Sequence, residues 1–337
     1  MAQRTLSRRE RLERTIHGQA TDRVPVALWR HFPGDDQDPG SLAAVIAAFQ
    51  REYDFDFVKV TPASSFCVKD WGVDDVWNGN GEGTRDYTRR AIAAPDEWTR
   101  LPRLDPTRGH LGAQLRCLEL LRATFADETP FIQTIFSPLA QARNLAGGDA
   151  ALVHLRRYPD ALKAGLETIT ATTIDFIEAA KPCNIGGIFY AQNHATYRLL
   201  SEVEYLEFAR PYDLRVLEAA KDLWLNVLHL HGNEIMFDLI ADYPAAVVNW
   251  HDRETLPSLA DGLKKVKGAA CGGVRQWETL VRGTPGDVRR ECADALRQTG
   301  GRRFILGTGC VTPIVAPTGN IRAVREAVEK ELKVMGN

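Results

Sequence analysis

Two histidines, one residue apart, end an apolar and strand-like run in this chain. The run LNVLHL (225–230) contains His229, and His231 follows it directly. Residues i and i+2 of a β-strand point to the same face, so both imidazoles can aim at one point and share a metal cation. Gly232 then ends the strand, and a helix can begin at Asn233. Alternatively, one histidine packs in the core while the other caps the loop.

A cysteine follows the last strand-like run of the chain. In ILGTGCVTP, Cys310 comes just after the predicted strand at 303–308. If the fifth and eighth predicted strands lie across the mouth of an eight-stranded barrel, His229, His231 and Cys310 converge. Two imidazoles and a thiolate form a zinc shell with one position left open. A buried free cysteine is the alternative interpretation.

Other polar side chains follow predicted strands and are candidates for proton transfer or ligand binding. His251 and Asp252 follow AAVVNW (245–250) and are the candidate catalytic residues. Arg30 follows VPVALW (24–29), and an arginine there can hold a carboxylate bidentately. The other candidates for substrate binding are equally compatible with supporting roles, and they are His31, Tyr190, Gln192, His194, Asn249 and Arg275.

Eight β-rich runs alternate with amphipathic segments. The runs are 24–29, 55–60, 131–136, 185–190, 225–230, 245–250, 268–273 and 303–308. Apolar residues recur at helical spacing in the segments 41–53, 111–125, 161–180, 201–223, 284–300 and 319–335. This alternation predicts an α/β fold, a (β/α)8 TIM barrel with an N-terminal helix and its site at the carboxyl ends of the strands. A doubly wound open sheet is the alternative.

Residues 62–109 interrupt the alternation and are too long for a simple loop. Turn residues flanked by Trp77 and Tyr87 predict a hairpin-like insertion after the second strand, beside the barrel mouth. The GNGEG run (79–83) does not open a helix after a strand, so we interpret it as a turn and not a phosphate loop. No repeat or linker is visible, and a single domain over residues 1–337 is predicted.

The composition is that of a soluble globular protein. Hydrophobic residues make up 44% and charged residues 26%, with a formal net charge of -2 and mixed signs along the chain. This argues against a nucleic-acid groove or a membrane-surface patch. The basic run RTLSRRERLERTIHG (4–18) lacks the apolar core that a signal peptide has, and no run approaches the ~18 apolar residues that a membrane span requires. The six cysteines are scattered, so reduced thiols in a cytoplasmic protein are expected.

The N-terminal run ERLERTIHGQATDRVPVALWRHFPG resembles the start of the uroporphyrinogen decarboxylase superfamily. SEVEYLEFARPYDLRVLEAAK is similar to the helix after its fourth strand, and LGTGCVTPIVAPTGNIRAVREAV to its last strand, loop and helix. The resemblance covers nearly the whole chain. It implies a (β/α)8 barrel with the site in its mouth, and it makes a homodimer an expectation.

True uroporphyrinogen decarboxylases differ from this chain at residues that carry their chemistry. By spacing, Ala63 stands where they keep an aspartate, and Asn144 lies near the place of their tyrosine. Their L-G-H-G is LGTG here, with Thr308 replacing the histidine, and only Arg30 of the decarboxylase set remains. Decarboxylation of uroporphyrinogen is therefore not expected.

A second branch of the superfamily consists of zinc-dependent methyltransferases that move methyl groups between corrinoid proteins and thiols such as coenzyme M. Their ligand motif is His-x-Cys-Gly after strand five, with a cysteine in a G-C turn after strand eight. HLHG and TGC match these positions, so the resemblance implies metal ligation by His229 and Cys310. His231 replaces the motif's cysteine and is still a competent zinc ligand.

The resemblance thus predicts a zinc-dependent methyltransferase acting between a corrinoid such as methylcobalamin and a thiol or related small acceptor. No corrinoid-binding motif is visible, so the corrinoid would arrive on a separate protein or as a free cofactor. A histidine-rich shell also accepts iron, cobalt or nickel. Two alternatives stay open: a decarboxylase of a smaller carboxylate held by Arg30, and a noncatalytic tetrapyrrole or corrinoid binder.

Overall fold

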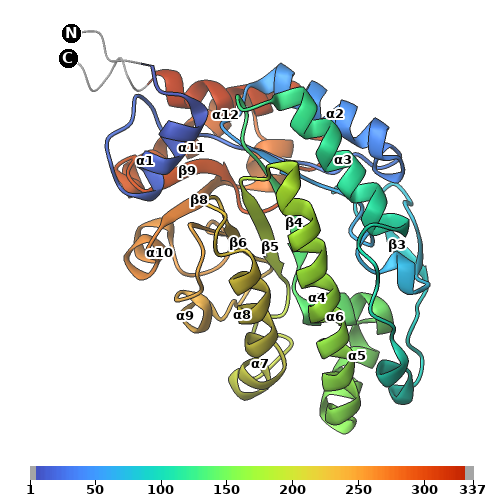
Figure 1. Cartoon of the computed structure of the whole chain (residues 1–337). Coiled ribbons are helices and arrows are strands. Elements are labelled where there is room, and N and C mark those ends of the chain that lie inside the picture. The colour runs from blue at the N-terminus through green and yellow to red at the C-terminus, as the bar shows by residue number, and fades with distance from the viewer. Residues whose placement is uncertain (1–4, 331–337) are drawn as a thin grey trace.

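The computed structural model describes residues 5–330 and is built on one curled, parallel β-sheet (Figure 1). Its seven strands lie side by side in chain order, and they are β1 (Val58–Val60), β4 (Phe131–Phe136), β5 (Gly187–Gln192), β6 (Val227–Leu230), β7 (Val247–Trp250), β8 (Ala269–Val274) and β9 (Phe304–Thr308). A doubly wound sheet would not keep the strands in chain order. The order therefore contradicts that alternative and matches the strand arrangement of a TIM barrel.

Helices cover the outside of the sheet (Figure 1). The long ones are α2 (Pro39–Tyr53), α3 (Gly109–Phe125), α6 (Pro159–Ala180), α11 (Pro285–Thr299) and α12 (Thr318–Lys330). The shorter ones are α1 (Arg8–Ile16), α4 (Pro138–Ala146), α5 (Gly148–Arg157), α7 (Glu202–Phe208), α8 (Arg210–Ala219), α9 (Phe237–Ile240) and α10 (Leu259–Lys265). The amphipathic segments are confirmed as helices, although 201–223 divides into α7 and α8. The predicted last segment ends at 335, and its residues 331–335 lie outside the described range.

The expectation of a strand at residues 24–29 is wrong. Residues 24–29 form no strand within the described chain, where Val26 makes a single parallel bridge to Leu306 of β9. Pro25 has no N–H to donate, and the Val26 amide donates to the Asp56 carboxylate, at 2.8 Å, and not to a strand carbonyl. The segment 24–29 nevertheless lies between β9 and the chain before β1, because the Asp56 amide donates to the Val26 carbonyl at 2.9 Å.

The expectation of a helix from Asn233 is also wrong, because the helix begins only at Phe237. Ile235 forms an isolated antiparallel bridge with Thr196, and Glu234 has φ 52°, a left-handed conformation that no residue inside an α-helix adopts. These two features hold residues 233–235 as a turn next to the end of β6.

The curled sheet encloses a core of its own. Alternate strand residues pack inside it, namely Ile132, Phe189, Val227, Val247, Ala269 and Ile305, and Ala27 and Phe57 join them from outside the strands. A second and larger apolar cluster fills the space between the sheet and the helices. Among residues 5–330 no helix is long and apolar enough to cross a membrane.

Within residues 62–109, two short strands pair antiparallel, β2 (Asp74–Val76) and β3 (Asp86–Arg89). The glycine-rich run 79–83 joins them. The Gly81 carbonyl accepts a hydrogen bond from the Ile314 amide at 2.8 Å, and the Glu82 carboxylate accepts one from Trp277 Nε1 at 2.9 Å. These bonds hold the run against the segments that follow β8 and β9.

Candidate metal centre

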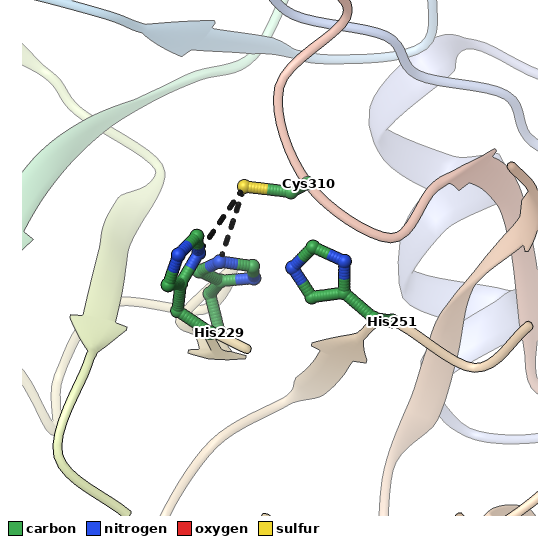
Figure 2. Close-up of side chains that lie close together, drawn as sticks. His229, His251 and Cys310 are labelled. Atoms are coloured by element: carbon green, nitrogen blue, oxygen red, sulfur yellow. Dashed lines mark hydrogen bonds between the residues drawn. The ribbon is translucent and has the colours of Figure 1, made fainter. Parts of the chain in front are cut away.

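Four potential metal ligands meet at the carboxyl ends of three strands (Figure 2). His229 lies in β6 with His231 just after it, His251 follows β7, and Cys310 follows β9. The Cys310 Sγ atom lies 3.5 Å from Nε2 of His229 and 3.6 Å from Nδ1 of His231. One ligand atom from each of the four lies within 4.8 Å of every other. The i, i+2 spacing therefore does aim both histidines at one point, and Cys310 reaches it.

The four side chains have the chemistry that a divalent metal requires. Imidazole nitrogen and thiolate sulfur are the ligands that zinc prefers, in tetrahedral shells of four. The Nε2 atom of His251 is buried and has no hydrogen-bond partner, and the His251 ring points toward His229 and Cys310 in Figure 2. An unpaired nitrogen in such a position is the donor that a metal would use, so the group fits a metal.

Asn249 fixes the orientation and tautomer of His229. Its amide Nδ2 donates to the carbonyls of Cys271 and Thr308, both at 2.9 Å, so its Oδ1 is the atom left to accept. That Oδ1 lies 2.7 Å from Nδ1 of His229, which must therefore carry the proton. The Nε2 lone pair is then free and faces Cys310, as in metal sites whose histidines are held by an outer hydrogen bond.

Glu254 supports His251 in a similar way. The Glu254 carboxylate lies 3.4 Å from Nδ1 of His251, which leaves Nε2 for the centre. Burial opposes protonation of His251, but contacts with Cys310 and Glu254 outweigh it and raise the pKa of His251 to about 10. Without a metal, a proton on His251 thus balances the negative charges around it, and a divalent cation can take the place of that proton.

The histidines also set the charge of Cys310. Burial alone raises the pKa of this thiol, but His229, His231 and His251 together hold its pKa well below the ordinary value. Burial raises the pKa of Cys67 and Cys117 to about 12, and no such partners oppose it there. Cys310 therefore has the thiolate character that metal binding needs.

We expect iodoacetamide to alkylate Cys310 of the metal-free protein at a rate that stays level through neutral pH. An ordinary thiol, with a pKa of about 8.5, loses reactivity in proportion to its thiolate fraction as the pH falls. A depressed pKa keeps the Cys310 thiolate populated below that point, while Cys67 and Cys117 stay unlabelled. Mass-spectrometric mapping of labelled sites over a pH series measures this. A Cys310 rate that falls tenfold per pH unit below about 8.5 would contradict it.

A cavity of about 460 Å³ opens beside the cluster. His229, His231 and Cys310 form part of its wall, and Trp29 and Phe189 contribute an aromatic surface. The Phe189 ring stacks on the His229 ring at 5.2 Å between centroids. The volume is that of a small-molecule site.

Comparisons with known proteins identify the family. The model of the family described as uroporphyrinogen decarboxylase matches residues 7–331. The chain belongs to the uroporphyrinogen decarboxylase family. This confirms the resemblance that the sequence motifs indicated.

Similar proteins place the chain nearer the methyltransferases of that family than the true decarboxylases. The methylcobamide:CoM methyltransferase MtbA of Methanosarcina mazei is 22% identical over 95% of this chain and 97% of its own length. The protein of the same name from Methanosarcina acetivorans is 20% identical over the same shares. A solved methyltransferase structure from Methanosarcina mazei covers 97% of this chain and 99% of its own, with a TM-score of 0.85 at 18% identity. That likeness shows the fold.

Thr308 has a structural role beside the candidate metal centre. Thr308, which replaces a histidine of the decarboxylases, donates from its hydroxyl to the Cys310 carbonyl at 2.5 Å. Its own carbonyl accepts from Asn249. Thr308 thus shapes the turn that presents Cys310 and links that turn to the residue that orients His229.

Several residues that the sequence proposed for substrate binding lie outside the cavity. Tyr190 and Gln192 point to the helical side, where both donate to the buried Asp213 carboxylate of α8, at 2.5 and 2.6 Å. Arg30 packs over the Phe32 ring, 5.1 Å from its centroid. Arg275 lies 3.6 Å from Glu291 in a partly exposed ion pair.

The other predicted residues divide between the cavity and its surroundings. His31 lines the cavity, and burial lowers its pKa to about 3, so it is neutral. His194 is buried with an unpartnered Nδ1, but its neighbour Asn193 is the residue that reaches the cavity. Asp252 lies outside, where it accepts from the Gly273 amide at 3.0 Å. Its burial raises its pKa to about 6.

Sequence reasoning missed the basic residues of the cavity. Lys59 of β1, Arg90 after β3 and Arg143 of α4 all line it. Lys59 had a detectable signal, because a lysine flanked by apolar residues in a buried strand must place its charge on one of two buried faces. Arg90 and Arg143 had none, because each lies outside the sheet strands in an ordinary polar context.

Proposed function

We propose that this chain is a zinc-dependent methyltransferase that moves a methyl group between a corrinoid and a thiol or related small acceptor. The observation that carries the proposal is the convergence of three imidazoles and one thiolate beside a small-molecule cavity. The proposal is also supported by the two similar proteins, which are methylcobamide:CoM methyltransferases. Cysteine and histidine ligands favour zinc.

His229, His231, Cys310 and His251 are the residues that would hold the metal. When bound, the metal supplies Lewis acidity that lowers the pKa of an acceptor thiol and makes it a nucleophile at neutral pH. A catalytic shell keeps one position for substrate, so three protein ligands suffice during turnover. Nε2 of His251, which has no hydrogen-bond partner, would then accept the proton that the acceptor thiol loses.

The surrounding residues orient the ligands and exclude water. Asn249 holds His229 in the tautomer with a free Nε2, and Glu254 keeps Nδ1 of His251 occupied. Trp29 and Phe189 cover the inner wall with aromatic surface. A nucleophile in a drier site interacts more strongly with the charges around it.

The corrinoid is proposed to act from outside the cavity. A volume of about 460 Å³ suits the small acceptor, and a corrin ring with its side chains is larger than such a molecule. We therefore propose that a separate corrinoid protein, or a free cofactor, presents the methyl group at the barrel mouth. The acceptor would be held inside.

Metal content and methyl transfer test the proposal together. Plasma mass spectrometry of protein purified without chelators should find about one zinc per chain, matching one four-ligand centre. Thiol-dependent demethylation of methylcobalamin, followed by its absorbance, should stop after chelation and return when zinc is added back. Protein that stays metal-free after incubation with zinc would remove the basis of the proposal.

The two alternatives have less support. A decarboxylase of a smaller carboxylate held by Arg30 would need this arginine in the cavity, and its side chain packs against Phe32 instead. A noncatalytic tetrapyrrole or corrinoid binder would not need an oriented set of metal ligands. Binding of a corrinoid without turnover in the presence of zinc would favour the binder.

A further inference from the structure

Of the three histidines of the candidate metal centre, His231 is the one that no side chain in residues 5–330 holds from its outer side. Asn249 holds His229 and Glu254 holds His251, each through the ring nitrogen that faces away from the cluster. His231 has only the contact of its Nδ1 with the cluster, and the residue is exposed. Its position must therefore be fixed mainly through its backbone.

The backbone of His231 is hydrogen-bonded to the last residue of β5. Its amide donates to the Gln192 carbonyl at 3.0 Å, just beyond the point where β5 and β6 stop pairing, at Gln192 and Leu230. A backbone bond at the exposed end of a strand pair opens easily, because few contacts hold it closed. The position of His231 thus depends on how firmly Gln192 is held.

The side chain of Gln192 is buried and forms hydrogen bonds through both atoms of its amide. Its Nε2 donates to the Asp213 carboxylate of α8 at 2.6 Å. Its Oε1 accepts from the His194 amide at 2.9 Å and from the Ser137 hydroxyl at 3.3 Å. These bonds tie the end of β5 to α8, to the residue that caps α4, and to the loop that follows β5.

Asp213 is a fixed anchor for this amide. It is fully buried, and its carboxylate accepts from four buried donors, which are Gln192, Tyr190, Tyr205 and Tyr243. Burial raises the pKa of Asp213 to about 6, although these hydrogen bonds oppose the effect, so the carboxylate is ionised at neutral pH. Hydrogen bonds to a buried charge are stronger than neutral ones, and a satisfied network of them is rigid.

We propose that Gln192, anchored by Asp213, is the positioning residue for His231. The proposal rests on the proposed function, because it requires His231 to bind the metal. The Gln192 side chain lies on the helical side of the sheet, and its carbonyl reaches the His231 amide on the strand beside it. One residue therefore links the position of α8 to that of a metal ligand.

Gln192→Met tests this proposal, with Tyr243→Phe as the matched control. Methionine keeps the length of the side chain and removes both amide contacts, whereas Tyr243→Phe removes another donor to the same carboxylate and leaves the Gln192 contacts in place. Zinc affinity, measured by chelator competition, should fall about tenfold in Gln192→Met, the lower end of the loss for an outer partner of a metal ligand. It should stay at the wild-type value in Tyr243→Phe.

A second variant serves if the methionine protein does not fold. The amide of Gln192→Asn is one methylene too short to reach both Asp213 and the His194 amide, so this variant keeps a polar group and loses the link. It should show the same direction of change in zinc affinity.

Two measurements without turnover separate positioning from general stability. Cobalt(II) bound in place of zinc has visible absorption bands that report the geometry of its ligands, and these bands should shift or weaken in Gln192→Met alone. In metal-free protein, the peptide that carries His231 should exchange its amide hydrogens faster in Gln192→Met than in the wild type or Tyr243→Phe. Both variants should unfold at a lower temperature, because each loses a buried hydrogen bond to a charged group.

Two results would overturn the proposal. If Gln192→Met lowers only the unfolding temperature, with zinc affinity, cobalt bands and exchange unchanged, Gln192 does not position His231. If Tyr243→Phe changes these three properties as much as Gln192→Met does, the cause is a general loosening of the Asp213 network. If the wild type methylates no thiol but its zinc affinity and cobalt bands depend on Gln192, the methyltransferase function fails and the positioning role stands.

Discussion

Cys310→Ser and His229→Ala should each remove the bound metal and thiol-dependent methyl transfer together. Both side chains are buried at the centre of the cluster, with Sγ and Nε2 3.5 Å apart. Serine replaces a thiolate by a hydroxyl that stays protonated and binds zinc weakly, and alanine removes the imidazole. Loss of an outer partner alone costs metal affinity by about 10- to 100-fold, so loss of a ligand should exceed about 100-fold.

Zinc affinity, measured by competition with a chromogenic chelator, and methylcobalamin demethylation check this result. Cys183→Ser and His110→Ala are matched controls, because Cys183 follows α6 and His110 is an exposed residue of α3, both away from the cavity. The controls should keep about one zinc per chain, as expected for a single four-ligand site. A Cys310→Ser protein that also keeps zinc and activity would show that the metal binds elsewhere.

The fold was predictable because strand burial leaves a strong pattern. β4, β5, β8 and β9 are buried along most or all of their length, so each reads as an apolar run in the sequence. The segment 24–29 has the same pattern and still forms no strand. Its backbone bonds to Leu306 of β9, but the Val26 amide donates to the Asp56 side chain. Asp56 is distant in sequence and is itself held by Arg11 and Arg23, each at 2.7 Å. Local pattern carries no information about that contact.

The site was predictable only as far as strand periodicity reaches. Side chains two residues apart on a strand point to the same face, which predicted that His229 and His231 lie together. The position of Cys310 after the last strand placed its thiol near these two histidines. The inclusion of His251 depends on register, because His229 pairs with Asn249 across β6 and β7. This register sets His251 opposite His231. A register between strands is fixed by packing and not by either strand alone, so His251 could not be assigned as a ligand from sequence.

The alternation of side chains along a strand also explains why Tyr190 and Gln192 lie outside the cavity. Phe189, Ala191 and Asn193 line the cavity, so residues of the other parity, Tyr190 and Gln192, must face the helices. There the Asp213 carboxylate accepts from both, and also from Tyr205 and Tyr243 at 3.0 Å. Assigning the odd-numbered residues of β5 to the cavity and the even-numbered ones to the helices would have separated the two groups from sequence alone.

Asn249→Leu should weaken zinc binding by about 10- to 100-fold, the usual loss when an outer hydrogen bond to a metal-binding histidine is removed. Without Oδ1, Nδ1–H of His229 has no acceptor, and the tautomer with its proton on Nε2 is no longer disfavoured. The carbonyls of Cys271 and Thr308 lose their donors as well. Each unsatisfied buried group costs about 1–3 kcal/mol, so the variant should also be less stable.

Asn249→Asp distinguishes orientation of the histidine from general packing. A carboxylate still accepts from Nδ1 of His229, but it cannot donate to the two carbonyls. This variant should therefore lose stability, as Asn249→Leu does, while keeping zinc affinity close to that of the wild type. Thermal unfolding and chelator competition measure the two properties separately. If both variants lost zinc affinity equally, Asn249 would act by filling space, and the tautomer of His229 would have to be set by Cys310 alone.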